Sequence, residues 1–185
     1  ITLPDVRFRP LPWIQEHFLL LYGRTLFHVS LGVKPPPELL AAFADPQMRA
    51  RVANAHQTGG LEPLVAEALP ALASLGMNAV AVTLLYRQAM MQQPDGRITL
   101  EEPVDYQAAV DARKLFRIGE LDVPMEGGVE RVTVWAAPVQ AAEGPDRAGL
   151  IVYLAHPYIA TVIYPAGSEE AERLRLRQMW LLGRG

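Results

Sequence analysis

Cysteine is absent from this chain of 185 residues. Its absence excludes thiol nucleophiles, disulfide frameworks and the usual zinc ribbons as the basis of a function. A chain without disulfides suits a reducing compartment, so we predict a cytoplasmic location, although a cysteine-poor exported protein would have the same composition. The chain begins at Ile1 rather than at methionine, which leaves the presence of a leader open.

An excess of positive charge is also missing. The chain has 17 basic and 20 acidic residues, which gives a formal charge of -3. Proteins that bind DNA or RNA through the phosphates normally carry a basic surface. The histidines, at His17, His28, His56 and His156, are scattered and lack a second ligand at metal-binding spacing. We therefore predict no nucleic-acid partner, no metal and no cofactor.

The longest apolar stretch, residues 64–86, contains Glu67 as its only charge. Its length would be sufficient to cross a bilayer. Pro70, Gly76 and Asn78 interrupt it, however, and alanine is its commonest residue. A helix followed by a buried strand accounts for this pattern better than a membrane span, so we predict no span.

The order of helical and strand patterns favours an α+β fold. Hydrophobic residues make up 50% and charged residues 20% of the chain, as in ordered globular proteins, and the length suits one domain over residues 1–185. Helical patterns precede strand patterns, which predicts N-terminal helices packed on a C-terminal, mainly antiparallel β-meander with a closing C-terminal helix. The expected parts are an extended arm at 1–12, a helical part at 13–76 (helices 13–30, 38–44, 47–57 and 61–75), a sheet part at 77–166 and a C-terminal helix at 167–185. Asp45-Pro46 signals the start of the helix at 47–57, and Ser168 is the expected N-cap of the C-terminal helix.

The sheet part contains β-branched and aromatic runs separated by turn signals. Residues 79–103 are predicted to form a long hairpin that turns at Pro94-Asp95-Gly96, and residues 105–113 allow a short helix. The sequence LIVYLA at 150–155 is apolar throughout, so we expect that strand near the centre of the sheet with both faces covered. The other predicted strands are 114–123, 129–138 and 159–164.

A polar line marks the predicted helix at 13–30. At about 100° per residue, His17, Arg24 and His28 share one narrow line with Trp13 and Leu21, whereas most of the circumference is apolar. A buried imidazole or guanidinium needs a partner. The line is therefore either a solvent-facing edge, which we favour, or the lining of a small anion or carboxylate site with His17, Arg24 and His28 as candidate ligand-binding residues.

No catalytic motif stands out. His56 and His156 lack an acidic or histidine neighbour at ligand spacing, and we interpret both as structural. Glu101 and Glu102 are adjacent on a predicted strand, so their side chains would point to opposite faces and would not converge for acid–base chemistry. No serine lies in the G-x-S-x-G context of a nucleophile elbow. The sequence thus identifies no catalytic residue.

The C-terminal helix carries two apolar lines instead of one. The first consists of Ala171, Leu174, Leu181 and Leu182, and the second of Leu176, Met179 and Trp180. A surface helix needs only one such line. Either the second line docks on another chain or the helix is buried on both sides. We take Leu176, Met179 and Trp180 as candidate interface residues.

These observations lead to a ranked interpretation of function. The first is a non-catalytic protein–protein interaction or assembly module that self-associates, based on the apolar content, the two-lined helix and the lack of catalytic motifs. The alternative is a small-ligand-sensing regulatory domain with its pocket between the helix at 13–30 and the sheet. An enzyme ranks third. The layout alone does not decide among them, because one fold can host many functions.

Overall fold

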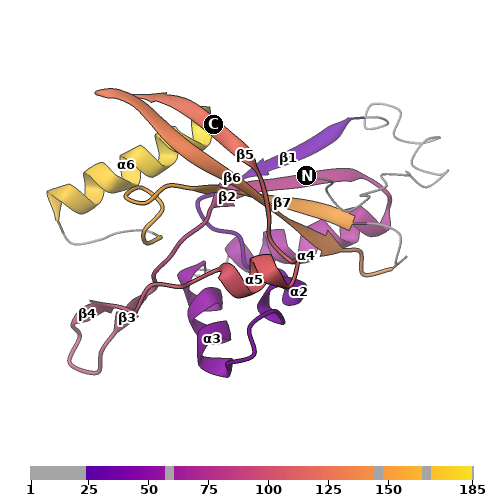
Figure 1. Ribbon diagram of the computed structural model, residues 1–185, viewed down its shortest axis with the longest axis horizontal. Coiled ribbons are helices and arrows are strands. Elements are labelled where there is room, and N and C mark those ends of the chain that lie inside the picture. Colours follow the sequence, from indigo (N-terminus) through magenta and orange to yellow (C-terminus); the bar gives the residue numbers. More distant parts are fainter. Residues whose placement is uncertain (1–23, 57–60, 144–147, 164–167, 185) are drawn as a thin grey trace.

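The computed structural model describes residues 24–56, 61–143, 148–163 and 168–184 (Figure 1). Its main element is a five-stranded sheet with the strand order β1-β2-β7-β6-β5. The strands are β1 (Thr25–Val29), β2 (Asn78–Leu84), β5 (Phe116–Met125), β6 (Gly128–Gln140) and β7 (Ala148–Ala155). The arm predicted at 1–12 and the candidate residue His17 lie outside the described residues.

Half of the sheet is parallel. β1 pairs with β2, and β2 with β7, in parallel, whereas the pairs β7–β6 and β6–β5 are antiparallel. The combination of helices and sheet agrees with the predicted α+β class, but the prediction of a mainly antiparallel meander is wrong. Parallel neighbours need a crossover connection, and the helices between β1 and β2 provide it. Only β5, β6 and β7 form the predicted meander.

β1 replaces the end of the helix predicted at 13–30. Residues 25–29 are extended and pair with residues 78–82, with Phe27 beside Val80. The sequence TLFHV is rich in β-branched and aromatic residues, and an apolar run this short has no periodicity that separates strand from helix. The helical prediction is therefore wrong for these residues, because their pairing partner lies far along the chain.

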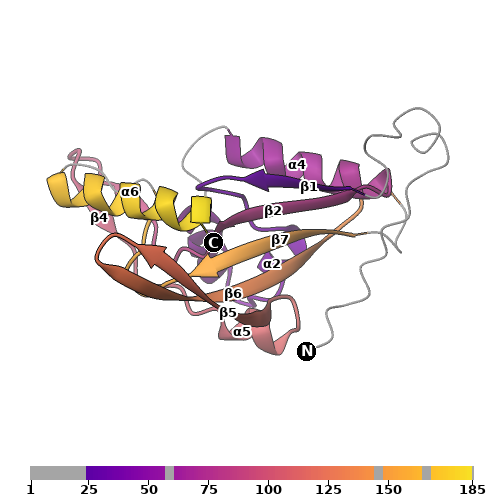
Figure 2. The same ribbon diagram turned by 90° about the horizontal axis from the view of Figure 1, so that it is seen from above.

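Three helices connect β1 to β2 and cover one face of the sheet (Figures 1 and 2): α2 (Pro37–Leu40), α3 (Pro46–Ala55) and α4 (Leu61–Ser74). α3 begins at the predicted signal Asp45-Pro46, where the Asp45 carboxylate accepts a hydrogen bond from the Gln47 amide at 2.9 Å. α4 packs on β7 at Gly149, where an added Cβ would be in ordinary van der Waals contact with the Leu69 carbonyl oxygen at 3.6 Å.

The apolar stretch at 64–86 is divided between α4 and β2. Most side chains of β2 are buried, so the predicted helix followed by a buried strand is confirmed. β7, which contains LIVYLA, lies between β2 and β6 at the centre of the sheet, as predicted. In the part of the chain that the structure describes, no helix combines the length and apolar character needed to cross a membrane.

A separate antiparallel hairpin projects from the sheet and consists of β3 (Met90–Gln92) and β4 (Ile98–Leu100). Its turn is the predicted one: Gly96, with φ of 81°, donates its amide to the Gln93 carbonyl at 2.9 Å. The prediction of one long hairpin over 79–103 is wrong, because β2 pairs with β1 and β7 instead. The short helix α5 (Gln107–Asp111) lies within the ambiguous residues 105–113.

α6 (Glu169–Arg184) lies on the other side of the sheet and contacts β5 and β2 (Figures 1 and 2). Ser168 precedes it, and its hydroxyl oxygen accepts a hydrogen bond from the Ala171 amide at 3.1 Å, which confirms the predicted cap. The strand predicted at 159–164 is wrong in its described part, residues 159–163, where only an isolated bridge joins Val162 to Gln88.

Candidate functional site

Arg24 and His28 do not have the geometry predicted for them. With residues 25–29 in β1, the helical spacing that placed these two side chains one turn apart is lost. Both residues are exposed at the edge of the described sheet, and neither lines the pockets described below. A binding role for Arg24, His28 and His17 stays a prediction, without the geometry that motivated it.

α6 has one buried face and one exposed apolar face. Leu181 and Leu182 belong to the core. By contrast, Leu176 and Met179 are each 51% exposed and Trp180 is 42% exposed. Their spacing of three and four residues places these three side chains together on the solvent side of the helix. We call this surface the α6 patch, and its role as an interface remains a prediction.

A hydrogen-bonded network fixes α6 on the sheet. One carboxylate oxygen of Glu130, on β6, accepts from His156 Nε2 at 3.0 Å, and the other accepts from the Arg177 guanidinium. His156 Nδ1 accepts from the backbone amides of Tyr158 and Ile159 at 3.2 and 3.1 Å. The proton of the neutral ring is therefore on Nε2. Both ring nitrogens are engaged, so His156 is not a free base.

Gln178 provides a second attachment of α6. It is fully buried, and its Nε2 donates to the carbonyl oxygens of Ile159 and Val162 at 2.9 and 2.8 Å. The carbonyls of this segment thus bond to a side chain of α6 in the way that other segments bond to a neighbouring strand. The segment after β7 is held against α6 and does not form the predicted strand. The inner face of α6 thus holds the loop, and the α6 patch faces outward.

A hollow of about 490 Å³ lies beside the α6 patch, between α6 and the turn that joins β5 to β6. Leu176 and Trp180 line it from the helix, and Met125 lines it from the end of β5. Arg184 lies over the indole of Trp180, with its guanidinium carbon 4.9 Å from the ring centroid. The surface is therefore hollowed next to exposed apolar side chains and has room for a side chain from a partner.

Charged residues extend the α6 patch into a regular row. Glu172, Leu176, Trp180 and Arg184 follow one another at intervals of four residues, and all four are exposed. The row has an acidic end, an apolar middle and a basic end. Leu176 and Trp180 in the middle of the row were predicted as interface residues, whereas Glu172 and Arg184 at its ends were not, although the interval of four can be counted in the sequence.

A second buried polar group lies in the opposite layer. His56, which follows α3, is fully buried, and its ring contacts those of Tyr86, Tyr106 and Tyr153 edge-on at centroid distances of 5.6, 6.4 and 5.5 Å. The Tyr106 hydroxyl donates its one proton to the Tyr86 carbonyl at 2.6 Å, so it accepts from His56 Nε2 at 3.0 Å. Nδ1 of His56 has no hydrogen-bond partner among the described residues.

Burial determines the protonation of this cluster. It lowers the pKa of His56 to about 3, because an imidazolium would lose its hydration without gaining an opposite charge. Burial also raises the pKa values of the Tyr106 and Tyr153 hydroxyls. All three groups are therefore neutral near pH 7. The cluster is enclosed, which agrees with the structural interpretation of His56.

A pocket of about 540 Å³ lies where the parallel strands β2 and β7 end. Ligands often bind at this edge of open sheets that contain parallel strands. Arg87, Asp105, Trp135 and His156 are among its lining residues. Because both nitrogens of His156 are engaged, the pocket contains an arginine and a carboxylate but no free imidazole to act as a general base.

Among the described residues, no three histidine, aspartate or glutamate side chains form a group that could hold a metal ion. Comparison of the chain with models of known protein families and with curated proteins found no match. The candidate site is therefore defined by geometry. Exposed apolar side chains, a hollow and ordered charges coincide at the α6 patch.

Proposed function

We propose that this chain is a non-catalytic assembly module that self-associates through the α6 patch. The row formed by Glu172, Leu176, Trp180 and Arg184 carries the proposal. A twofold axis at the level of residue 178 exchanges the two halves of this row. In an antiparallel pair of α6 helices, Leu176 would lie beside Trp180 of the second copy, and Glu172 beside its Arg184.

The dimensions of α6 support this pairing. Residues 172 and 184 lie about 18 Å apart along the helix axis, so the row covers about three turns. Rows with an interval of four residues are the ridges that interlock in the commonest class of helix pairs, at a crossing angle of about −50°. The apolar middle would exclude water, and the charged ends would specify the antiparallel orientation. Such a self-complementary surface is what a twofold homodimer requires.

Two matched leucine variants test the interface by sedimentation velocity. Leu176 is 51% exposed on α6, and Leu64 is 61% exposed on α4 in the opposite layer. Leu176→Ala should weaken self-association at least about tenfold, and Trp180→Ala more strongly, whereas Leu64→Ala should leave it unchanged. Equal effects of the two leucine variants, or a wild-type chain that stays monomeric at concentrations on the order of 100 μM, would contradict the proposal.

Charge reversal tests the antiparallel orientation. Glu172→Arg places two arginines opposite each other in the dimer, and Arg184→Glu places two glutamates opposite each other, so each variant alone should associate more weakly than the wild type. An equimolar mixture of the two variants restores both ion pairs and should restore association. Glu102→Arg, at an exposed position outside α6, is the control. A mixture that remains monomeric would rule out this orientation.

A further inference from the structure

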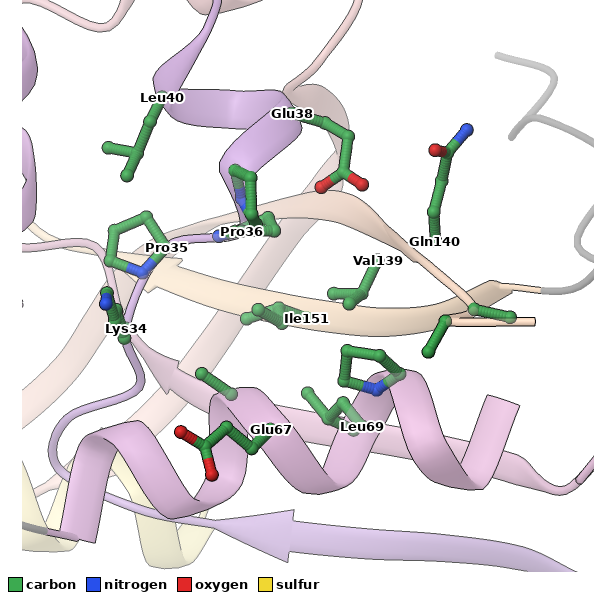
Figure 3. A pocket seen from close by; sticks show the side chains of 15 residues that line it. Lys34, Pro35, Pro36, Glu38, Leu40, Glu67, Leu69, Val139, Gln140 and Ile151 are labelled. Atoms are coloured by element: carbon green, nitrogen blue, oxygen red, sulfur yellow. The ribbon is translucent and has the colours of Figure 1, made fainter. Parts of the chain in front are cut away.

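A pocket of about 470 Å³ lies on the helical face of the sheet, between α2 and α4 (Figure 3). Leu69 lines it from α4, Pro36 and Leu40 line it from the segment around α2, and Val139 and Ile151 line it from β6 and β7. Its volume is in the range of small-molecule sites, and most of its lining is apolar. The pocket and the α6 patch lie in opposite layers.

The walls of this pocket are held in place by the fold. Each ring of Pro35-Pro36-Pro37 restricts the backbone before α2. On the other side, α4 is attached to the end of β6. The Pro70 carbonyl accepts from the Ala142 amide at 3.4 Å, and the Ser74 hydroxyl accepts from the Glu143 amide at 2.9 Å. A ligand would therefore meet a preformed cavity.

One buried hydrogen-bond acceptor at the pocket lacks a donor among the described residues, and one carbonyl of α4 lacks the donor that a regular helix supplies. Glu38 directs its carboxylate toward the strands (Figure 3), and its Oε2 is buried with no hydrogen-bond partner among the described residues. Pro70 lies inside α4 and has no amide hydrogen, so the carbonyl of Ala66 lacks the donor that helices supply four residues later. Burying an acceptor without a donor is costly, so a ligand that donates hydrogen bonds would be favoured here.

The charge of the lining is also negative. Glu38 and Glu67 come from α2 and α4, and Lys34 is the only basic residue among the lining side chains. Neither carboxylate forms an ion pair within the described part of the chain. A negatively charged ligand would be opposed by two carboxylates, whereas a cation would be attracted.

We propose that this pocket binds a small amphiphilic amine. The protonated amino group would donate to the Glu38 carboxylate and to the Ala66 carbonyl, and an aliphatic or aromatic body would pack against Leu69, Val139 and Ile151. An ammonium group offers several donors and one positive charge, which matches the acceptors of the pocket. Transfer of the apolar body out of water supplies the remaining affinity. This site is independent of self-association through α6.

Three probes of similar size test the ligand class: phenethylammonium, phenethyl alcohol and phenylacetate. Each is titrated into the isotope-labelled full chain, and amide chemical shifts are followed by NMR. We expect the amine to bind with a Kd on the order of 1 mM or below, at least about tenfold more tightly than the alcohol. The largest shifts should occur at Leu69, Val139 and Gln140, and phenylacetate should not bind.

Two matched variants assign the charge preference to Glu38. Glu38→Gln should reduce the preference for the amine over the alcohol to about twofold or less. Glu102→Gln, the same change at an exposed position outside the pocket, should leave the preference unchanged. Pro70→Ala restores an amide donor for the Ala66 carbonyl and should weaken amine binding about two- to threefold. If the ligand-free spectrum shows that Glu38→Gln is unfolded, the Pro70→Ala variant tests the binding of the amine in its place.

Three outcomes would overturn this inference. Phenylacetate that binds as tightly as the amine would indicate an anion site at Lys34. An amine that produces no shifts in the pocket at about 10 mM would exclude a site of this class. A folded Glu38→Gln variant with the wild-type preference would show that Glu38 does not select the charge of the ligand.

Discussion

The two layers that cover the sheet each enclose a buried polar side chain, and they differ in the hydrogen bonds that they offer it. In the layer of α2 to α5, His56 forms one hydrogen bond with Tyr106 and is otherwise surrounded by aromatic rings. In the layer of α6, Gln178 donates to two loop carbonyls, and Glu130 joins His156 to Arg177. The His56 cluster contains neutral groups alone, whereas the α6 layer uses hydrogen bonds and charge to position a helix.

This difference predicts which layer is sensitive to acid and which surface tolerates substitutions. Among the described residues, the groups that contact His56 are neutral tyrosines, which cannot compensate an added proton, so this cluster should be sensitive to acid. The hydrogen bonds that hold the α6 layer come from Gln178 on the inner face of the helix and from Arg177 beside it, whereas Leu176, Met179 and Trp180 are 42–51% exposed. We therefore expect substitutions on the outer face of α6 to cost the fold little.

Acidification should have a large effect on the layer that contains His56. Burial lowers the pKa of His56 from 6.5 to about 3. Between these values the unfolded chain binds a proton that the folded chain excludes. The contribution of a neutral His56 is fully present above pH 6.5 and is lost as the pH falls, by roughly 1.4 kcal/mol per unit. From about pH 6 to about pH 4, urea denaturation should show a loss of about 2–3 kcal/mol in the free energy of unfolding from this residue.

His56→Phe provides the control for this pH dependence. Phenylalanine keeps an aromatic ring among the three tyrosines but does not titrate. The free energy of unfolding of the variant should therefore decrease less steeply with falling pH, whatever its absolute stability. Equal slopes for the wild type and the variant would mean that His56 remains uncharged in the unfolded chain or finds a partner when protonated in the folded one.

Truncation of Gln178 should reduce the free energy of unfolding more than truncation of Trp180, although Trp180 is the larger and more hydrophobic side chain. Gln178→Ala removes the donor from two carbonyls and leaves a cavity, so it should cost about 2–4 kcal/mol. Trp180→Ala removes more atoms but from an exposed position, and it should cost the monomer about 1 kcal/mol or less. Denaturation of dilute samples measures both. A cost of about 3 kcal/mol or more for Trp180→Ala would place Trp180 in the core and contradict the α6 proposal.

Local signals in the sequence predicted the parts of the fold that depend on neighbouring residues. The entry Asp45-Pro46, the cap Ser168 and the turn at Pro94-Asp95-Gly96 all form as expected, because each satisfies backbone groups within a few residues. The two apolar lines of α6 differ in exposure: Leu181 and Leu182 of the first line are buried, whereas the members of the second line are exposed. Helical periodicity extends over the whole length of α6, so the sequence could separate the two lines, although it left open whether the second line is buried.

Pairings between distant residues were not predictable from local patterns. β1 becomes a strand through parallel pairing with β2, and its short apolar sequence suits either state. Gln178 is polar, so no apolar pattern marks it as buried, although it bonds the loop that was predicted as a strand. The His56 cluster likewise depends on tyrosines that only the fold brings together.

A smaller effect should follow from changing Glu130. Glu130→Gln keeps the shape of the side chain and one acceptor for His156, but it removes the negative charge that faces Arg177. Because the Glu130 side chain is 31% exposed, the cost should be about 1–2 kcal/mol in thermal or chemical denaturation. An unchanged stability would mean that the ion pair between Glu130 and Arg177 does not help to position α6.

The smallest effect should come from the outer surface of α6. Arg173 donates to the Glu169 carboxylate at 2.6 Å, and the two side chains are 74% and 78% exposed. Water and salt screen such a pair, and holding two long side chains in one geometry costs conformational entropy. Arg173→Gln should therefore change the free energy of unfolding of the monomer by about 0.5 kcal/mol or less. A loss of more than about 1 kcal/mol would give this outer side chain a structural role comparable to that of Glu130. The contrast between the anchored and the free face of α6, on which the proposed interface depends, would then disappear.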